Sequence, residues 1–206
     1  MESKSLNKFK KTISRCEALV ESYKALHAQN QVGGVTPAPK DIVRGAVVLS
    51  VAALDAYVTD VFAEKLVAYL KAYTPDESLV QLLSDAGLDT KEALKLITME
   101  RPYRRIRNLI QQYYQRYTTQ KFQVIDELFL HYRLMKITAN AEGRSGKKGI
   151  KTSVGKLIDR RHDIAHGGDY NLYGKINDID EDKIAKRIKH LEILVVNIDA
   201  IICNRI

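Results

Sequence analysis

Cysteine, tryptophan and long apolar runs are scarce in this sequence of 206 residues, which has no tryptophan and two cysteines. Cys16 and Cys203 lie near opposite ends, each within an apolar pattern of helical spacing, which argues against a disulfide framework or a cysteine-ligated metal cluster. We expect two buried, reduced thiols. No run reaches the roughly 18 to 20 apolar residues of a membrane helix, and the charged N-terminal segment lacks a signal-peptide pattern. These absences predict a cytoplasmic protein without membrane segments.

Strand-like alternation is absent too, and the apolar residues recur at helical spacing instead. The four prolines punctuate this pattern: two lie in a loop at 31–40, Pro75 ends a helix, and Pro102 occupies a first helical turn. Helices are expected at about 6–30, 41–73, twice within 76–100 on either side of Gly87, and at about 102–117, 122–138 and 180–202. One more should follow a cap at Thr152 or Ser153 and end at Gly167-Gly168, after a mobile basic loop at 140–151. We therefore predict an all-α bundle with the apolar 41–73 helix at its centre.

The positive charge of the chain is regional. The formal net charge is +8, and residues 101–161 alone hold 15 lysines and arginines against four acids. A one-sided positive field suits a partner with a phosphate backbone, such as RNA, although an anionic membrane or an acidic protein would satisfy it as well. The candidate RNA-binding residues are Arg104, Arg105 and Arg107, which belong to a segment, 103–117, that interleaves arginines with tyrosines, and Lys147, Lys148 and Lys151 of the basic loop. An ordinary solvated surface is the competing interpretation.

The segment Arg161-His162-Asp163-Ile164-Ala165-His166 concentrates four ionisable side chains just before Gly167-Gly168. Imidazole exchanges protons near neutral pH, and a guanidinium group offers a permanently charged fork for phosphate oxygens. RNA cleavage by its own 2′-hydroxyl needs both functions. Arg161 and His166 are five residues apart, about 140° around a helix, so they do not share a face. A twofold dimer would bring a second Arg161 and His166 to the opposite wall of a groove.

Two other interpretations of the same segment remain open. His162 and His166 have the i, i+4 spacing of zinc-binding helices, and Asp169 could add a ligand, but aspartate replaces the glutamate that serves as base in those enzymes. Alternatively, His166 and Arg160 simply complement the dipole at a helix C-terminus.

Asp55 is the unusual charge of the apolar 41–73 segment. A buried carboxylate requires a partner. Asp55 could orient Arg161 or His166 across the bundle, or it could form an ordinary internal salt bridge with Arg44 or Arg105.

Three features together resemble the HEPN superfamily, and most closely its RiboL-PSP-HEPN branch. They are an apolar helix containing Ala53-Leu54-Asp55-Ala56-Tyr57, the segment from Leu157 to Gly167, and one closing helix. The likeness spans roughly 40–70 and 150–205. The chain would then be a single domain, 1–206, in which 76–150 is a candidate family-specific helical insert.

The resemblance implies a helical homodimer that cuts RNA without metal or cofactor. Arg161 and His166 would carry catalysis with His162 or Asp163 in support, and Asp55 and Arg160 would assist them. The products would be a 2′,3′-cyclic phosphate and a 5′-hydroxyl. Such proteins serve as toxins or in defence against phage, which implies regulation by an antitoxin or another protein. A non-catalytic dimer that binds RNA or protein is the alternative that the same fold allows.

Overall fold

The computed structural model describes residues 2–33, 39–114 and 119–206, and their regular structure is helical except for one isolated antiparallel bridge between Tyr170 and Ile176. In chain order, the helices of these ranges are α1 (Lys4–Gly33), α2 (Asp41–Ala72), α3 (Glu77–Asp85), α4 (Thr90–Ile97), α5 (Pro102–Tyr114), α6 (Phe122–Leu130), α7 (Ile137–Arg144), α8 (Ile150–Gly167) and α9 (Glu181–Arg205). The all-α prediction is confirmed. The end of the expected 102–117 helix lies partly outside the described residues.

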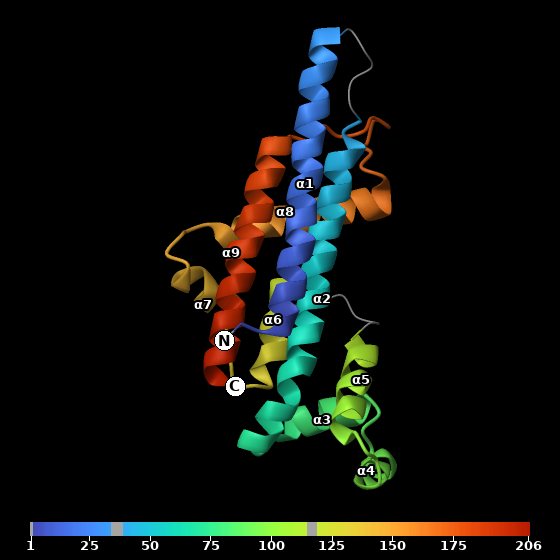
Figure 1. Ribbon diagram of the computed structural model, residues 1–206, viewed down its shortest axis with the longest axis vertical. Helices are drawn as coiled ribbons and strands as arrows, with labels where there is room; N and C mark the ends of the chain where they lie inside the picture. The colour runs from blue at the N-terminus through green and yellow to red at the C-terminus, as the bar shows by residue number, and fades with distance from the viewer. Residues whose placement is uncertain (1, 34–38, 115–118) are drawn as a thin grey trace.

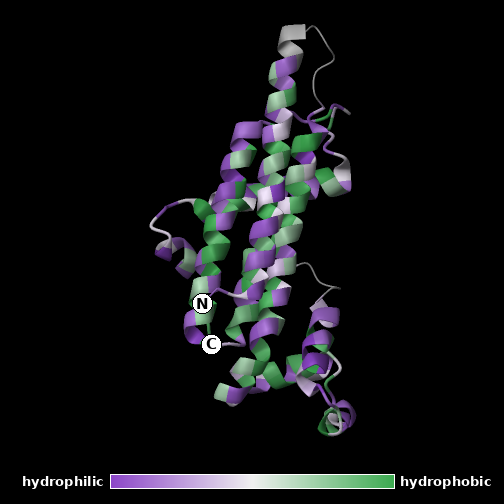
Figure 2. Cartoon of the chain, viewed as in Figure 1, coloured by the Kyte–Doolittle hydropathy of each residue, from purple (hydrophilic) through white to green (hydrophobic). Residues whose placement is uncertain are grey.

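Three long helices, α1, α2 and α9, run side by side, and α8 crosses them while α3, α4 and α5 gather near one end (Figure 1). Hydrophobic and hydrophilic residues alternate along α1 and α9, as expected of helices that bury one face (Figure 2). α2 packs against α1, α5, α6, α8 and α9, which confirms it as the central helix. Val51, Leu54, Val58 and Phe62 on α2 have no exposed surface.

α2 is long and apolar enough to cross a membrane, which the search for continuous apolar runs did not anticipate. In the described part of the chain no other helix meets that criterion. In its most apolar window, 61% is buried inside the bundle, as in the core helix of a soluble protein. The same burial explains its composition, because a helix covered on most sides requires apolar residues around its circumference.

The helix expected at 122–138 is confirmed over Phe122–Leu130, but its continuation to 138 is wrong, because the chain turns between α6 and α7. Arg133 and Lys136 adopt left-handed backbone angles, with φ of 58° and 48°. The turn buries Tyr132, whose hydroxyl donates to the Phe62 carbonyl at 2.6 Å and whose ring stacks on that of Phe62. Helical periodicity continues through this segment, so only the tertiary contact of Tyr132 reveals the break.

The basic segment 140–151 is also not the mobile loop that was predicted. Its first part belongs to α7, and α8 already begins at Ile150, which is completely buried. The residue before α8 is Gly149, with φ of 81°, so neither Thr152 nor Ser153 caps the helix. The three glycines suggested a loop, but only the tight turn around Gly146 and Gly149 uses their left-handed conformation.

The two cysteines are free, as expected. Cys16 is buried, and burial raises the pKa of its thiol to about 11. Cys203 is only partly buried, which differs from the prediction, and it lies beside Asp199 with Sγ 3.6 Å from a carboxylate oxygen.

Candidate functional site

The candidate segment from Arg161 to His166 forms the last turns of α8, and the helix ends in a left-handed turn. Gly168 has φ of 60°, and the backbone N–H groups of Gly168 and Asp169 both donate to the carbonyl of Asp163, the latter at 3.2 Å, which satisfies a carbonyl at the helix end. This confirms Gly167-Gly168 as the helix stop. The cap fixes the point at which the helix gives way to the segment 169–180.

Asp169 anchors that segment to the bundle. Its side chain is fully buried, and its Oδ2 accepts hydrogen bonds from Arg44 Nε and Arg160 Nη2, each at 2.7 Å. Arg44 also donates to the carbonyl of Asn177 at 2.6 Å, and Arg160 donates to that of Asp178 at 3.0 Å. We call this set, Arg44, Arg160 and Asp169, the arginine clasp. It joins α2, α8 and the segment leading to α9.

In the arginine clasp, Arg160 binds Asp169 and the carbonyl of Asp178, so it holds the segment after α8 in place and does more than complement the helix dipole. The clasp also employs Asp169 as an acceptor for two guanidinium groups. Among the described residues, no group of three or more histidine, cysteine or acidic side chains is arranged to hold a metal ion. Sequence reasoning singled out each of these residues for another purpose, and only the fold brings Arg44 to Asp169, 125 residues away.

Arg161 lies about 100° around α8 from Arg160 and continues the inward stripe formed by Val154, Leu157 and Ile158. Its side chain lines a hollow of about 400 Å³ between α1, α2, α5 and α8. The other lining residues are Lys8, Ala52, Asp55, Ala56, Thr59, Asp60, Gln111 and Tyr114. Within the described ranges, the buried Nε of Arg161 has no hydrogen-bond partner. A buried donor without a partner is unfavourable in the free protein and available to an incoming acceptor.

His162, Asp163 and His166 point elsewhere. All three are exposed, and none lines the hollow that contains Arg161. The imidazole rings of His162 and His166 lie close together, with centroids 4.5 Å apart and planes inclined by 44°. A single chain thus presents its arginine and its histidines on different faces, as the 140° offset predicts.

Asp55 shares the hollow with Arg161 but is held by another segment. Its carboxylate accepts hydrogen bonds from the backbone N–H, at 2.7 Å, and the hydroxyl of Thr119. Neither of the salt-bridge partners that the sequence suggested is available to Asp55, because Arg44 belongs to the arginine clasp and Arg105 pairs with Glu92 at 2.6 Å. Thr119 is a partner that sequence spacing could not indicate, because it lies 64 residues away.

The six predicted RNA-binding residues separate into four groups. Arg104 and Arg107 are exposed and line a second hollow, next to the first, whereas Arg105 turns toward α4 and its partner Glu92. Lys147 and Lys148 line a hollow at the α7–α8 turn. Lys151 places its Nζ 5.3 Å from the centre of the Phe122 ring. They form no single surface with each other.

A family profile described as RiboL-PSP-HEPN matches residues 10–204 of the 206, which includes the segment 76–150 that the sequence resemblance left unplaced. No curated protein and no solved structure matches the chain.

Proposed function

Because the chain belongs to the RiboL-PSP-HEPN family, we propose that it is a metal-independent endoribonuclease. The family indicates a ribonuclease-like or RNA-related protein; the specific reaction is our inference. The observation that carries it is Arg161, whose side chain lines a hollow of about 400 Å³ and whose buried Nε has no hydrogen-bond partner among the described residues. A permanently charged fork with a free donor is suited to a phosphate oxygen.

In the proposed reaction, the 2′-oxygen of a ribose attacks the adjacent phosphorus while a base removes the 2′-hydroxyl proton. The bond from phosphorus to the 5′-oxygen breaks, and an acid protonates the departing oxygen. The products are a 2′,3′-cyclic phosphate and a 5′-hydroxyl, and neither metal nor cofactor is required. His166 serves as acid or base with His162 or Asp163 in support, and Arg161 stabilises the negative charge that develops on the phosphoryl oxygens.

A complete site requires a second copy of the chain. Arg161 faces the hollow, whereas His166 is exposed on another face of α8. In a twofold homodimer, His166 of one copy can approach the arginine side of the other, and the same contact is repeated by symmetry. The arginine clasp would hold the two helix ends in a fixed geometry, and Asp55 would contribute negative charge beside Arg161.

The second candidate is a non-catalytic dimer that binds RNA or protein. The observation that favours it is the separation of His166 from the hollow, since a cation alone can bind phosphate without cleaving it. Both candidates fit a cytoplasmic protein acting as a toxin or a phage-defence effector, restrained by an antitoxin or another regulatory protein.

The deciding experiment incubates the purified protein with total RNA and a structured tRNA in excess chelator. Cleavage with cyclic phosphate ends is expected from the parent and not from the folded Arg161→Ala and His166→Ala variants. Loss of one such preorganised group lowers rates by roughly 10²- to 10³-fold. Equal cleavage by all three proteins would reject these roles. RNA binding without cleavage by the parent would favour the second candidate, and cleavage abolished by the chelator would indicate a metal enzyme.

A further inference from the structure

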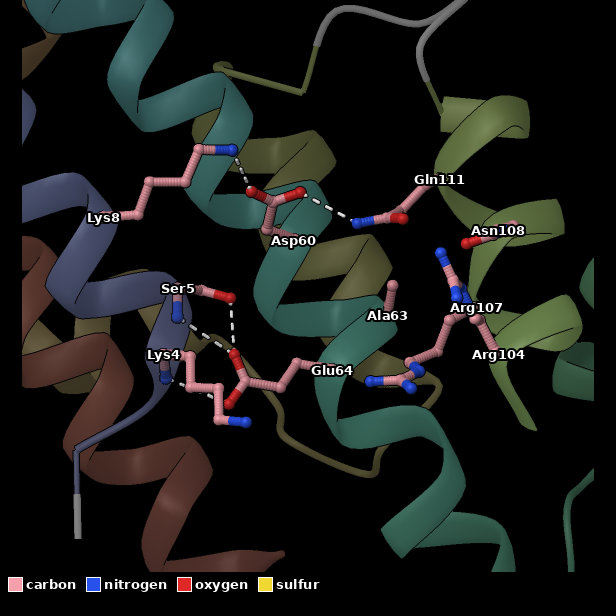
Figure 3. Close-up of a pocket in the computed structure, with 10 residues that line it drawn as sticks. All are labelled: Lys4, Ser5, Lys8, Asp60, Ala63, Glu64, Arg104, Arg107, Asn108 and Gln111. Atoms are coloured by element: carbon pink, nitrogen blue, oxygen red, sulfur yellow. Dashed lines mark hydrogen bonds and ion pairs between the residues drawn. The ribbon is translucent and has the colours of Figure 1, made fainter. Parts of the chain in front are cut away.

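The hollow that contains Arg161 opens into a longer groove. It adjoins a second hollow, of about 430 Å³, and both are lined by Lys8, Asp60 and Gln111. From Arg161 the combined groove runs between α1 and α5, over α2, to Arg104 on α5. Figure 3 shows its far part, where residues of α1 and α2 face residues of α5 across the gap.

One face of α5 forms a wall of this groove. The wall is formed by residues at positions i, i+3, i+4, i+7 and i+10 of the helix, which are Arg104, Arg107, Asn108, Gln111 and Tyr114. Ten residues of helix extend about 15 Å. The wall therefore presents two cations, two amides and an aromatic ring in a line that leads toward Arg161.

The groove contains three carboxylates, and each accepts hydrogen bonds from groups of the protein, Asp55 from Thr119 as described above. Asp60 accepts from Lys8 Nζ at 2.7 Å and from Gln111 Nε2 at 3.0 Å. Glu64 accepts from the hydroxyl of Ser5 at 2.6 Å and from the backbone N–H groups of Lys4 and Ser5, each at 3.0 Å. Burial opposes the change, but these bonds lower the pKa of the Glu64 carboxyl group. Asp60 and Glu64 are thus engaged by groups of the protein.

The arginines of the same groove are not engaged in this way. Arg104 and Arg107 extend into the gap in Figure 3, and neither has an ion-pair partner among residues 2–33, 39–114 and 119–206. With Arg161, whose Nε lacks a partner, they provide three guanidinium groups along one path. The floor adds the small side chains of Ala52, Ala56 and Ala63, which leave room for a chain to lie against α2.

We propose that this groove binds a single RNA strand, with phosphates of the strand on Arg104, Arg107 and Arg161. The inference rests on the proposed function and adds the path of the substrate, which runs along α5 toward Arg161. Arginines contact the backbone, amides and an aromatic ring can contact unstacked bases, and this combination is characteristic of single-strand recognition. Arg105, which is paired with Glu92, takes no part.

The test measures binding of a labelled single-stranded RNA to the full chain carrying His166→Ala, so that cleavage does not interfere. In this background, Arg104→Gln/Arg107→Gln is compared with Arg15→Gln/Arg101→Gln, which removes the same charge from exposed positions outside the groove. Loss of two phosphate contacts should weaken binding about tenfold and reduce the slope of log K against log salt by about 1.4, while the control stays near the parent.

A second pair of variants keeps both arginines. Ala56 is exposed on the groove floor, so Ala56→Lys should strengthen RNA binding and Ala56→Glu should weaken it, without disturbing the core. Equal losses in the two arginine pairs would overturn the groove assignment, as would unchanged salt slopes or an equal affinity for duplex RNA. Because binding is read from a variant without His166, this outcome is independent of whether the parent cleaves RNA.

Discussion

Arg160 and Arg161 are neighbours with opposite environments. Arg160 is bound by Asp169 and by backbone carbonyls, so its charge is used within the fold. Arg161 lines the groove, and its buried Nε has no partner among the described residues. One step along a helix rotates a side chain by about 100°, and this rotation places the first arginine in the clasp and the second in the groove. At the scale of residues, the proposed function therefore depends on helix register rather than on composition.

His131 provides a pH-dependent test at the same scale. Partial burial lowers the pKa of its imidazole below the usual 6.5, against the smaller opposing effect of Asp76. Its Nδ1 lies 3.0 Å from the hydroxyl of Ser78. Since the unfolded chain binds a proton more readily than the folded one, stability is complete above about pH 6.5 and decreases as the pH falls toward the folded-state pKa.

Between about pH 8 and about pH 5, we expect the free energy of unfolding to fall less in His131→Asn than in the parent. Urea denaturation at both values measures it, and an NMR titration gives the pKa of His131 directly. Burial also lowers the pKa of the His190 imidazole, so the same measurements on His190→Asn provide the matched comparison for His131→Asn. A His131 resonance that titrates above 6.5 would refute the interpretation.

At the scale of elements, the end of α8 depends on a single backbone conformation. Gly168 has φ of 60°, and a Cβ added there would meet the Tyr170 ring at 3.2 Å, whereas a Cβ on Gly167 would meet nothing within 4 Å. Two glycines that look equivalent in the sequence therefore differ: Gly168 makes the left-handed turn, and Gly167 is an ordinary helical residue.

Gly168→Ala should lower the free energy of unfolding by about 1–2 kcal/mol, because a side chain is unfavourable in the left-handed region. Gly167→Ala should leave it unchanged or raise it slightly, since alanine favours helix. Chemical denaturation followed by circular dichroism gives both values. Similar effects of the two substitutions would show that Gly168 is not the residue that turns the chain.

The arginine clasp makes a second prediction for these elements. Asp169→Asn tolerates the left-handed backbone but leaves two guanidinium groups without their buried carboxylate, which should destabilise the protein by about 3 kcal/mol. Asp178→Asn removes an equal charge from an exposed pair with Lys40 and should cost less than about 1 kcal/mol. Urea midpoints of the two variants provide the comparison, and equal midpoints would contradict a structural clasp.

At the scale of the whole molecule, the two halves of the motif belong to different surfaces. The groove contains Arg161, and the exposed face of α8 contains His162 and His166. If catalysis requires both, two copies must meet so that the surfaces complete each other, and a twofold axis then generates two equivalent sites.

Co-expression of Arg161→Ala and His166→Ala chains tests this composite site. In a mixed dimer, one site lacks both groups and the other retains both, so random pairing should restore about one quarter of the parent's cleavage. Each variant alone should be inactive, and analytical ultracentrifugation should show a dimer. Mixed dimers without cleavage would mean that each site is built within a single chain.

The sequence by itself determined the helical class, the central position of α2, the stop at Gly167-Gly168 and the angular separation of Arg161 from His166. All of these follow from local periodicity and from the conformational preferences of glycine and proline. The RiboL-PSP-HEPN resemblance was equally visible, because it depends on residues close together in the chain. The profile match over residues 10–204 confirmed it.

Only the tertiary structure decided which charges are engaged. Asp55 bonds to Thr119 and Arg44 bonds to Asp169 across 64 and 125 residues, distances over which sequence spacing carries no geometric information. The break at Tyr132 likewise depends on its contact with Phe62. Helical periodicity identifies the buried face of a helix, but the partner on that face, and hence the arginines left available for a ligand, is fixed only when the helices pack together.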